Sequence, residues 1–389
     1  MGGYLASGGH SPLSSVYGMG ADQALAFELV KPNGELVNVS ETTNPDLFWA
    51  LRGGGGSTFG VVVSVTIKVY PRLPVSVTQF SFRSGGGVSA DSFWKAVRTY
   101  FDLFISNADN GTYGYFNINS MPDINMSSPS SGPPVAPPSS NATSFTFTMH
   151  PFFAPNMTIA QSDALLKPLY DRLNALNIPV APKSQYFDNF HDGWQWGFPR
   201  EMVGNGGGVT ASRLWPRKNW QNQTLLGQTF DVIKESIEEG NMLIAFNFKN
   251  EAPAGVQNAI NPAWRTSVLH AISGNFWAPS AGRDEINRIW SKMTNGTIAK
   301  WRALSPGSGA YMNEADAREP NFQQSFFGDN YARLLKIKEE VDPQSVFYAP
   351  LGVGSESWHV ISESGLEALQ DGRLCKTTAS ASVQIPDDE

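Results

Sequence analysis

The stretch that decides the fold is Arg52-Gly53-Gly54-Gly55-Gly56-Ser57-Thr58-Phe59-Gly60, which runs directly into Val61-Val62-Val63-Ser64-Val65-Thr66-Ile67-Lys68-Val69-Tyr70. A dinucleotide-binding loop needs a strand before its glycines and a helix after them, because the helix N-terminus holds the phosphates. Here a short helix is expected over 47–51 and a β-rich run follows. A P-loop is excluded too, since no Gly-Lys-Ser/Thr is present. The glycines then indicate either close approach of the main chain to a flat or phosphorylated ligand, or a plain tight turn.

The segments around these glycines resemble a known family. They read Gly8-Gly9-His10-Ser11, then Tyr17-Gly18-Met19-Gly20-Ala21-Asp22, then Asn44-Pro45-Asp46-Leu47-Phe48-Trp49-Ala50-Leu51. Together they are similar to the second half of the PCMH-type FAD-binding domain of the vanillyl-alcohol oxidase superfamily. The resemblance is to fungal oxidases related to berberine bridge enzyme. Residues 311–316 and 327–338 look like the C-terminal element of that family, which packs back against the flavin domain.

This resemblance implies FAD as the cofactor and assigns residues to its site. The implied cofactor-binding residues are Gly8, Gly9, His10, Gly18, Asp22, Gly60, Val61 and Asn330, although Asn330 is equally well explained as a helix cap. Tyr311 aligns with the family tyrosine that faces the flavin, so it is a candidate catalytic base or a partner of one. The alternative is a tyrosine that only packs in a sheet. Asn313 is a second candidate catalytic residue, since on a strand it shares a face with Tyr311.

Family members usually begin with a smaller FAD subdomain that carries the pyrophosphate-binding loop and, in bicovalent members, flavin-attaching His and Cys residues. The chain is expected to lack this part. His10 does not correspond to the attaching His, because the segment Tyr17–Asp22 that follows it belongs to a later loop. Two hypotheses follow. One is an FAD-dependent oxidoreductase that passes hydride from a hydroxyl-bearing small molecule, such as an alcohol, sugar or secondary metabolite, to the flavin. The other is an inactive truncated fragment that cannot hold FAD.

Composition limits the kinds of partner that the protein is expected to bind. The net charge of −7 and the isoelectric point near 5.3 argue against nucleic acid, which requires a basic face. Cys375 is the single cysteine, so neither an internal disulfide nor a cysteine zinc site can form. No histidine pair has ligand spacing, so His150, His191, His270 and His359 are expected to be isolated and no metal is predicted. No apolar run is long enough to cross a membrane.

Seven Asn-x-Ser/Thr sequons favour a secreted glycoprotein, although the N-terminus does not have the pattern of a signal peptide. They lie at Asn38, Asn110, Asn125, Asn141, Asn156, Asn222 and Asn295.

The predicted fold class is α+β. A partial PCMH-type FAD-binding domain is expected over 1–74, and a substrate domain over 75–310 with an antiparallel sheet flanked by helices on one face. The berberine-bridge-like element would cover 311–364, and a polar tail 365–389. Strands are predicted at 24–30, 35–39, 59–70, 75–82, 112–119, 143–153, 242–249, 268–277 and 309–313. Helices are predicted at 47–51, 90–107, 159–176, 224–239, 283–294 and 330–340, and an exposed loop at 127–140.

Overall fold

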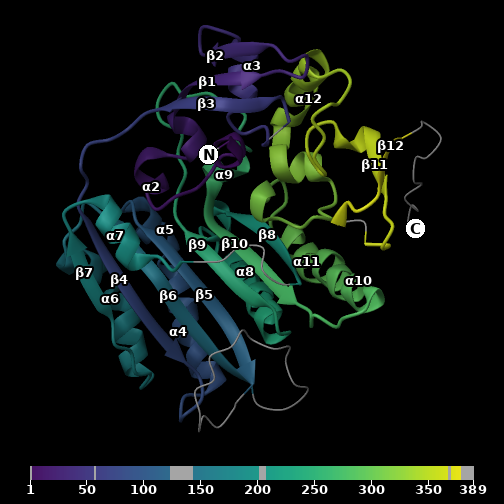
Figure 1. The fold of residues 1–389 in the computed structure, drawn as a ribbon. Helices are drawn as coiled ribbons and strands as arrows, with labels where there is room; N and C mark the ends of the chain where they lie inside the picture. Colours follow the sequence, from purple (N-terminus) through teal and green to yellow (C-terminus); the bar gives the residue numbers. More distant parts are fainter. Residues whose placement is uncertain (1, 57, 123–142, 201–206, 367–368, 378–389) are drawn as a thin grey trace.

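The computed structural model describes residues 2–56, 58–122, 143–200, 207–366 and 369–377. The predicted loop at 127–140 lies outside these residues. Two sheets organise the chain, and Figure 1 shows the smaller one above the larger one. Among the described residues, no helix combines the length and apolar character that crossing a bilayer requires.

The larger sheet has seven antiparallel strands in the order β7-β4-β6-β5-β9-β10-β8. Their bounds are Val75–Arg83 for β4, Tyr113–Pro122 for β5, Thr143–Pro155 for β6, Lys183–Phe187 for β7, Gly208–Pro216 for β8, Met242–Asn247 for β9 and Ser267–Phe276 for β10. Its strands carry alternating apolar residues, so each strand presents one set of side chains to each face.

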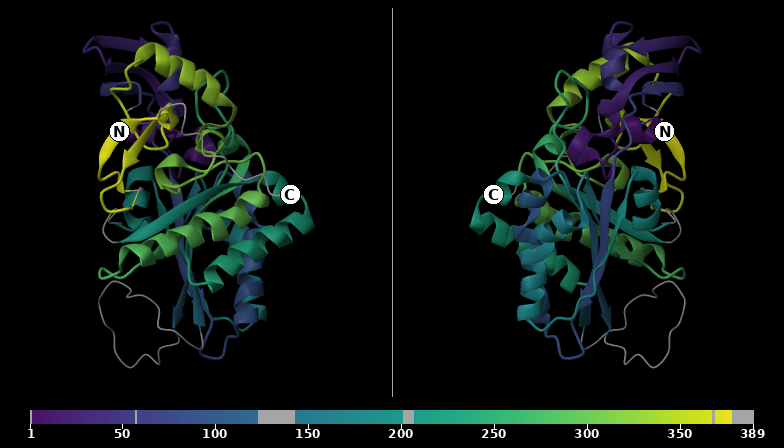
Figure 2. Two further views of the ribbon diagram at one scale, coloured as in Figure 1. Left: turned by 90° about the vertical axis from the view of Figure 1, so that its right-hand side faces the viewer. Right: turned by 90° about the vertical axis from the view of Figure 1, so that its left-hand side faces the viewer.

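Helices cover one face of this sheet, as the two side views in Figure 2 show. The helices that pack there are α4 (Ala90–Asp102), α6 (Ile159–Ala175), α8 (Gln223–Glu238), α10 (Arg283–Ser291) and α11 (Ile298–Ala303). Buried aromatic side chains such as Phe93, Phe101 and Phe147 fill the space between the layers. The prediction of an antiparallel sheet with helices on one face is therefore confirmed.

The opposite face of the sheet packs against the N-terminal segment and α7 (Phe190–Gly197). It presents Tyr113, Phe153 and Phe248, which pack with Trp264 and Tyr311. On β10 the neighbours Leu269 and Ala271 point into the helical layer, so His270 between them points to this second face. The strand alternation thus delivers a polar side chain to an aromatic surface.

The smaller sheet has the order β2-β1-β3, with β1 at Ala24–Val30, β2 at Leu36–Ser40 and β3 at Val61–Ile67. It packs with α3 (Pro45–Ala50) and with α12 (Tyr331–Val341) from the other end of the chain. The Lys338 ammonium is buried on α12 and donates to the Thr58 carbonyl oxygen at 2.7 Å. The C-terminal element therefore returns to the N-terminal region. The predicted domain boundaries stay predictions.

Short elements complete the chain. They are α1 (Gly2–Ala6), α2 (Ser14–Tyr17), α5 (Phe104–Asp109), α9 (Ala263–Thr266), β11 (Trp358–Ile361) and β12 (Arg373–Lys376).

Two expectations about local structure were wrong. The strand predicted at 309–313 is absent, and a short 3-10 helix, Met312–Glu314, stands at its end. The helix predicted at 90–107 divides at Leu103 into α4 and α5. Within the segment predicted as a polar tail, β12 pairs with β11. The strands β7 and β8 and the helix α7 were not predicted.

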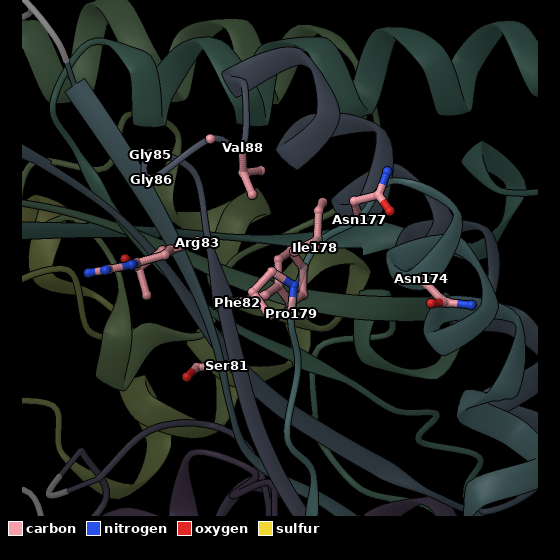
Figure 3. A pocket seen from close by; sticks show the side chains of 12 residues that line it. Ser81, Phe82, Arg83, Gly85, Gly86, Val88, Asn174, Asn177, Ile178 and Pro179 are labelled. Atoms are coloured by element: carbon pink, nitrogen blue, oxygen red, sulfur yellow. The ribbon is translucent and has the colours of Figure 1, made fainter.

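A cavity of about 840 Å³ lies at the end of β4 that is remote from the aromatic face (Figure 3). It is bordered by the turn Gly85–Gly87, by Arg83 and by Asn174 and Asn177 near the end of α6. Arg83 is the one titratable side chain among its lining residues, so the cavity does not hold the groups that acid–base chemistry requires.

Candidate functional site

The two glycine-rich parts of the sequence are joined by hydrogen bonds to a single carbonyl oxygen. The carbonyl oxygen of Ala6 accepts hydrogen bonds from the main-chain amides of Gly53 and Gly55, both at 2.9 Å. Gly53 has φ of 128°, and a Cβ there would lie 2.1 Å from the amide nitrogen of Ile260. Glycine is therefore required at this position by main-chain packing as well as by conformation.

The ring of Tyr4 lies over two further glycines. A Cβ at Gly9 would come within 2.6 Å of this ring, and one at Gly20 within 2.5 Å. The Tyr4 hydroxyl donates to the carbonyl oxygen of His10 at 3.0 Å, and burial raises the pKa of this phenol to about 12. A flat ring thus already rests on the main chain of the Gly8–His10 loop.

Asp22 is saturated by partners within the chain. Its Oδ1 accepts from Arg265 Nη2 and from Asn258 Nδ2, each at 2.7 Å. Its Oδ2 accepts from Arg265 Nη1 at 2.8 Å and from the Met19 amide at 2.7 Å. These four bonds fill the hydrogen-bonding capacity of a carboxylate. Asp22 therefore holds the predicted cofactor loop in place through hydrogen bonds within the chain. Direct contact between Asp22 and FAD stays a prediction.

The centre of the site is a carboxylate shared by two histidines. Glu314 Oε2 lies 2.7 Å from His270 Nε2 and 3.4 Å from His10 Nε2. The other ring nitrogen of His10, Nδ1, lies 2.9 Å from the hydroxyl of Tyr113. A hydroxyl, an imidazole and a carboxylate in a row form an arrangement that can accept and hold a proton.

Aromatic rings surround the two histidines, whereas the Glu314 side chain is about one-third exposed. The ring centroid of His10 lies 4.8 Å from that of Phe246, 5.8 Å from that of Trp264 and 5.6 Å from that of Tyr311. His270 is fully buried and its ring is stacked on Phe246. The low dielectric of such surroundings strengthens the hydrogen bonds between the polar groups.

Burial and pairing shift the pKa values within this cluster. Burial lowers the pKa of His270, and the neighbouring Glu314 carboxylate offsets only part of the effect. Burial acts to raise the pKa of Glu314, but the charge of His10 and the hydrogen bonds from His10 and His270 hold it well below its ordinary value. Burial raises the pKa of Tyr311 far above its usual range, so this phenol keeps its proton at neutral pH.

The two residues predicted as catalytic lie beside this cluster. Asn313 Nδ2 donates to the Tyr311 hydroxyl at 2.9 Å, and the Tyr311 side chain is buried. Tyr311 and Glu314 are joined by a main-chain hydrogen bond across the short helix, which places both at the aromatic face. The structure thus brings Tyr311, Asn313 and His10 together.

The remaining predicted cofactor residues are dispersed. Gly8 and Gly9 share the His10 loop, whereas Gly18 packs on Asp22. Gly60 lies against β1, since a Cβ there would be 2.6 Å from the Val30 carbonyl oxygen, and Val61 is exposed on β3. Asn330 stands at the start of α12, yet its side chain donates to the Ile260 carbonyl oxygen instead of capping the helix. Their roles toward a cofactor stay predictions.

The sequence interpretation missed three members of the cluster: Glu314, His270 and Tyr113. The expectation that His270 is isolated was wrong, because its partner Glu314 comes from a separate element. The ligand atoms of His10, His270 and Glu314 lie within 4.8 Å of one another. We assign no metal to them, because Nδ1 of His270 has no acceptor for the proton that a metal-bound imidazole carries there.

The N-terminal residues fit one side of a flavin. None of the described residues has an atom within 4 Å of a Cβ built on Gly3, so the main chain beside Tyr4 is open to a flat group. The hydroxyl of Ser7 is buried and has no partner among the described residues. An open glycine, an unpaired hydroxyl and a proton-accepting cluster together suit a planar ligand with polar edges.

Comparison with known proteins gives the class. A family model described as "Berberine and berberine like" matches residues 310–354, which include Tyr311 and Glu314. The crystal structure of the VAO-type flavoprotein MtVAO615 from Myceliophthora thermophila C1 superposes with a TM-score of 0.80 at 29% identity, covering 97% of this chain and 63% of that one. The fold is therefore that of the VAO-type flavoproteins.

Within this class, the chain is similar to FAD-linked oxidoreductases and carries a berberine-like C-terminal element. It is 32% identical over 382 residues to the FAD-linked oxidoreductase ZEB1 of Gibberella zeae, and 34% identical over 384 residues to the FAD-linked oxidoreductase patO of Aspergillus clavatus. Each alignment covers 97% of this chain and 60% of the relative. The chain thus spans about three-fifths of the length of these relatives.

Proposed function

We propose that this chain forms the substrate-facing part of an FAD-dependent oxidoreductase that oxidises a hydroxyl-bearing small molecule. The observation that carries the proposal is the Glu314 carboxylate, which is shared by His10 and His270 beside Tyr311. Oxidation of an alcohol removes a hydride from carbon and a proton from oxygen. FAD supplies the hydride acceptor, so the protein must supply a group that takes the proton.

The chain's own residues suit that task. His10 has a hydrogen-bond partner on each ring nitrogen and can therefore exist neutral or protonated without an unpaired N–H. Tyr311, which keeps its proton, can donate a hydrogen bond to the substrate oxygen. Asn313 Nδ2 donates to the same phenol and fixes its position. The aromatic rings exclude water from around the groups that carry the proton.

The proposal covers alcohols, sugars and secondary metabolites. Relatives carry the name FAD-linked oxidoreductase. The carbohydrate oxidase of Microdochium nivale shares the fold at 17% identity.

Flavin binding tests this proposal. The purified 389-residue chain is mixed with FAD, freed of unbound FAD by gel filtration and examined for the flavin absorbance bands. A panel of primary alcohols, secondary alcohols and sugars is then added without oxygen. Bleaching of the bands supports the oxidoreductase, and His10→Asn should slow it by about 10² or more, the usual contribution of acid–base catalysis.

The alternative function, an inactive fragment, predicts a different outcome. The chain would elute colourless and His10→Asn would change nothing. His191→Gln serves as the matched control in both cases, because His191 is exposed on α7 and its partners among the described residues are side chains of its own helix.

We also propose that the protein is a secreted glycoprotein. Five sequon asparagines, Asn38, Asn110, Asn156, Asn222 and Asn295, belong to the described residues, and all five are exposed. An exposed acceptor is what glycosylation requires. Treatment of protein from its natural source with an endoglycosidase should reduce its apparent mass; an unchanged mass would contradict the proposal.

A further inference from the structure

The two histidines that share Glu314 differ in what surrounds their second ring nitrogen. His10 Nδ1 lies 2.9 Å from the Tyr113 hydroxyl, which can donate to this nitrogen or accept from it. His270 Nδ1 is buried and has no hydrogen-bond partner among the described residues. The neighbours of His270 are the rings of Trp264, Phe246, His10 and Tyr311.

This difference fixes the tautomer of His270. Its Nε2 lies 2.7 Å from a carboxylate oxygen, and two acceptors cannot pair, so Nε2 must carry the proton. A second proton would create an N–H group on Nδ1 with no acceptor in an aromatic pocket. A buried, unpaired donor costs free energy, and a charged one costs more. His270 is therefore a neutral donor.

We propose that the two histidines divide the work, so that His270 is a positioning residue that keeps Glu314 ionised while His10 takes the proton. That this proton comes from a substrate hydroxyl rests on the proposed function. The substrate O–H bond breaks as the hydride leaves the carbon, and the proton ends on His10 Nδ1 through the Tyr113 hydroxyl. The resulting imidazolium is paired with the Glu314 carboxylate.

The other groups that face the cluster do not compete for this proton. Tyr4 comes from α1, Tyr113 from β5 and Tyr311 from the turn before Glu314, and all three are phenols. Burial raises the pKa of Tyr4 and of Tyr311, and burial lowers the pKa of His270. These shifts agree with the assignment that the geometry makes.

Nitrogen NMR of the histidines tests the assignment without flavin or substrate. The chain contains five histidines, so selective ¹⁵N labelling gives a resolvable spectrum, assigned with single His→Gln variants. In the unsubstituted chain we expect His270 to show the Nε2–H tautomer and no titration between pH 5 and pH 8. A titrating His270, or one that carries its proton on Nδ1, would overturn the proposal.

Two substitutions at one position separate positioning from packing. Gln in His270→Gln can still donate to Glu314, so the titration of His10 should stay nearly unchanged. Leu in His270→Leu cannot donate to Glu314, so the carboxylate becomes more basic. The protonation constant of His10 should therefore rise about tenfold, which corresponds to a shift of one pH unit. Equal His10 titrations in the two variants would contradict the role of His270.

Two further measurements keep the outcomes distinct. The His191→Gln substitution should leave the nitrogen signals of His10 and His270 unchanged. Addition of EDTA should also leave them unchanged, and a shift with EDTA would mean that a bound cation organises the cluster in place of the hydrogen bonds. If His270→Leu does not fold, the tautomer and titration in the unsubstituted chain still decide. If these signals are as expected but no alcohol bleaches the flavin, the proposed function fails and the division between the histidines stands.

Discussion

Asp22 and Arg265 form a bidentate ion pair that joins the N-terminal loop to the segment leading into β10. The Asp22 side chain is fully buried, and the Arg265 side chain is about one-fifth exposed. Since Arg265 lies five residues before His270, and Asp22 twelve after His10, the pair ties the two histidine-bearing segments together.

Replacing Arg265 should be costly because the buried carboxylate would remain without its cation. We expect Arg265→Leu to lower the free energy of unfolding by about 3–5 kcal/mol, measured by urea denaturation. Arg217→Leu is the control, since Arg217 makes a bidentate pair with Asp109 in which both side chains are a third or more exposed. That change should cost at most about 1 kcal/mol. Equal losses in the two variants would contradict this interpretation.

Two glycine substitutions should act in opposite directions. Gly53→Ala combines a positive φ with a main-chain overlap at Ile260, and the backbone strain alone costs about 1–3 kcal/mol. Gly227 lies inside α8, and within the described part of the chain no atom lies within 4 Å of a Cβ built there. Gly227→Ala should therefore stabilise by about 0.5–1 kcal/mol. Thermal unfolding of both variants measures the contrast, and a stabilised Gly53→Ala would show that the loop relaxes freely.

Stability should depend on pH through His270. Burial lowers its pKa in the folded chain, so the unfolded chain binds a proton more readily as the pH falls through about 6.5. The free energy of unfolding should therefore fall between pH 7.5 and pH 5.5. Glu314, whose folded pKa is also lowered, adds a loss only below about pH 4.5. The urea midpoints measured at pH 7.5 and at pH 5.5 should differ less in the His270→Gln variant than in the unsubstituted chain. An equal difference in the two proteins would exclude His270 as the cause.

Tyr311 should matter for turnover more than for folding. In FAD-loaded protein, Tyr311→Phe keeps the ring and removes the hydroxyl, so we expect flavin reduction to slow by about 10² with little change in thermal stability. Tyr331→Phe is the control, because its hydroxyl bonds to Glu356 on the surface and not to the cluster. If both variants reduce flavin at the unsubstituted rate, Tyr311 has no role in the chemistry.

Much of the fold follows from the sequence because strong periodicity marks it. The alternation in β4 and β6 and the apolar face of α8 were sufficient to place those elements. The strand β8 was missed because its alternation, which runs over 209–212, stops at Arg213, a charged residue that is nevertheless buried. The helix break at Leu103 depends on packing between α5 and the strands β9 and β10, which no local pattern encodes.

Only part of the candidate site could be predicted from the sequence. Tyr311 was proposed from the family resemblance and Asn313 from a predicted strand that the structure does not contain, and Glu314 stood in the same motif without a role. His270 carried one local signal, a histidine between two core residues of an apolar strand. Its meeting with His10 depends on how β10 and the first loop are brought together across the chain, which spacing along the sequence does not reveal.

The Ala6 carbonyl oxygen that accepts from both Gly53 and Gly55 sets a limit on how this protein can be rebuilt. Because one atom fixes the distance between the two loops, a change in the length of either loop moves the other. Transplanting the first loop alone from a relative would leave the second without its anchor. A successful graft must carry residues 2–22, the turn at 52–60 and the segment at 258–265 as a single unit of exchange.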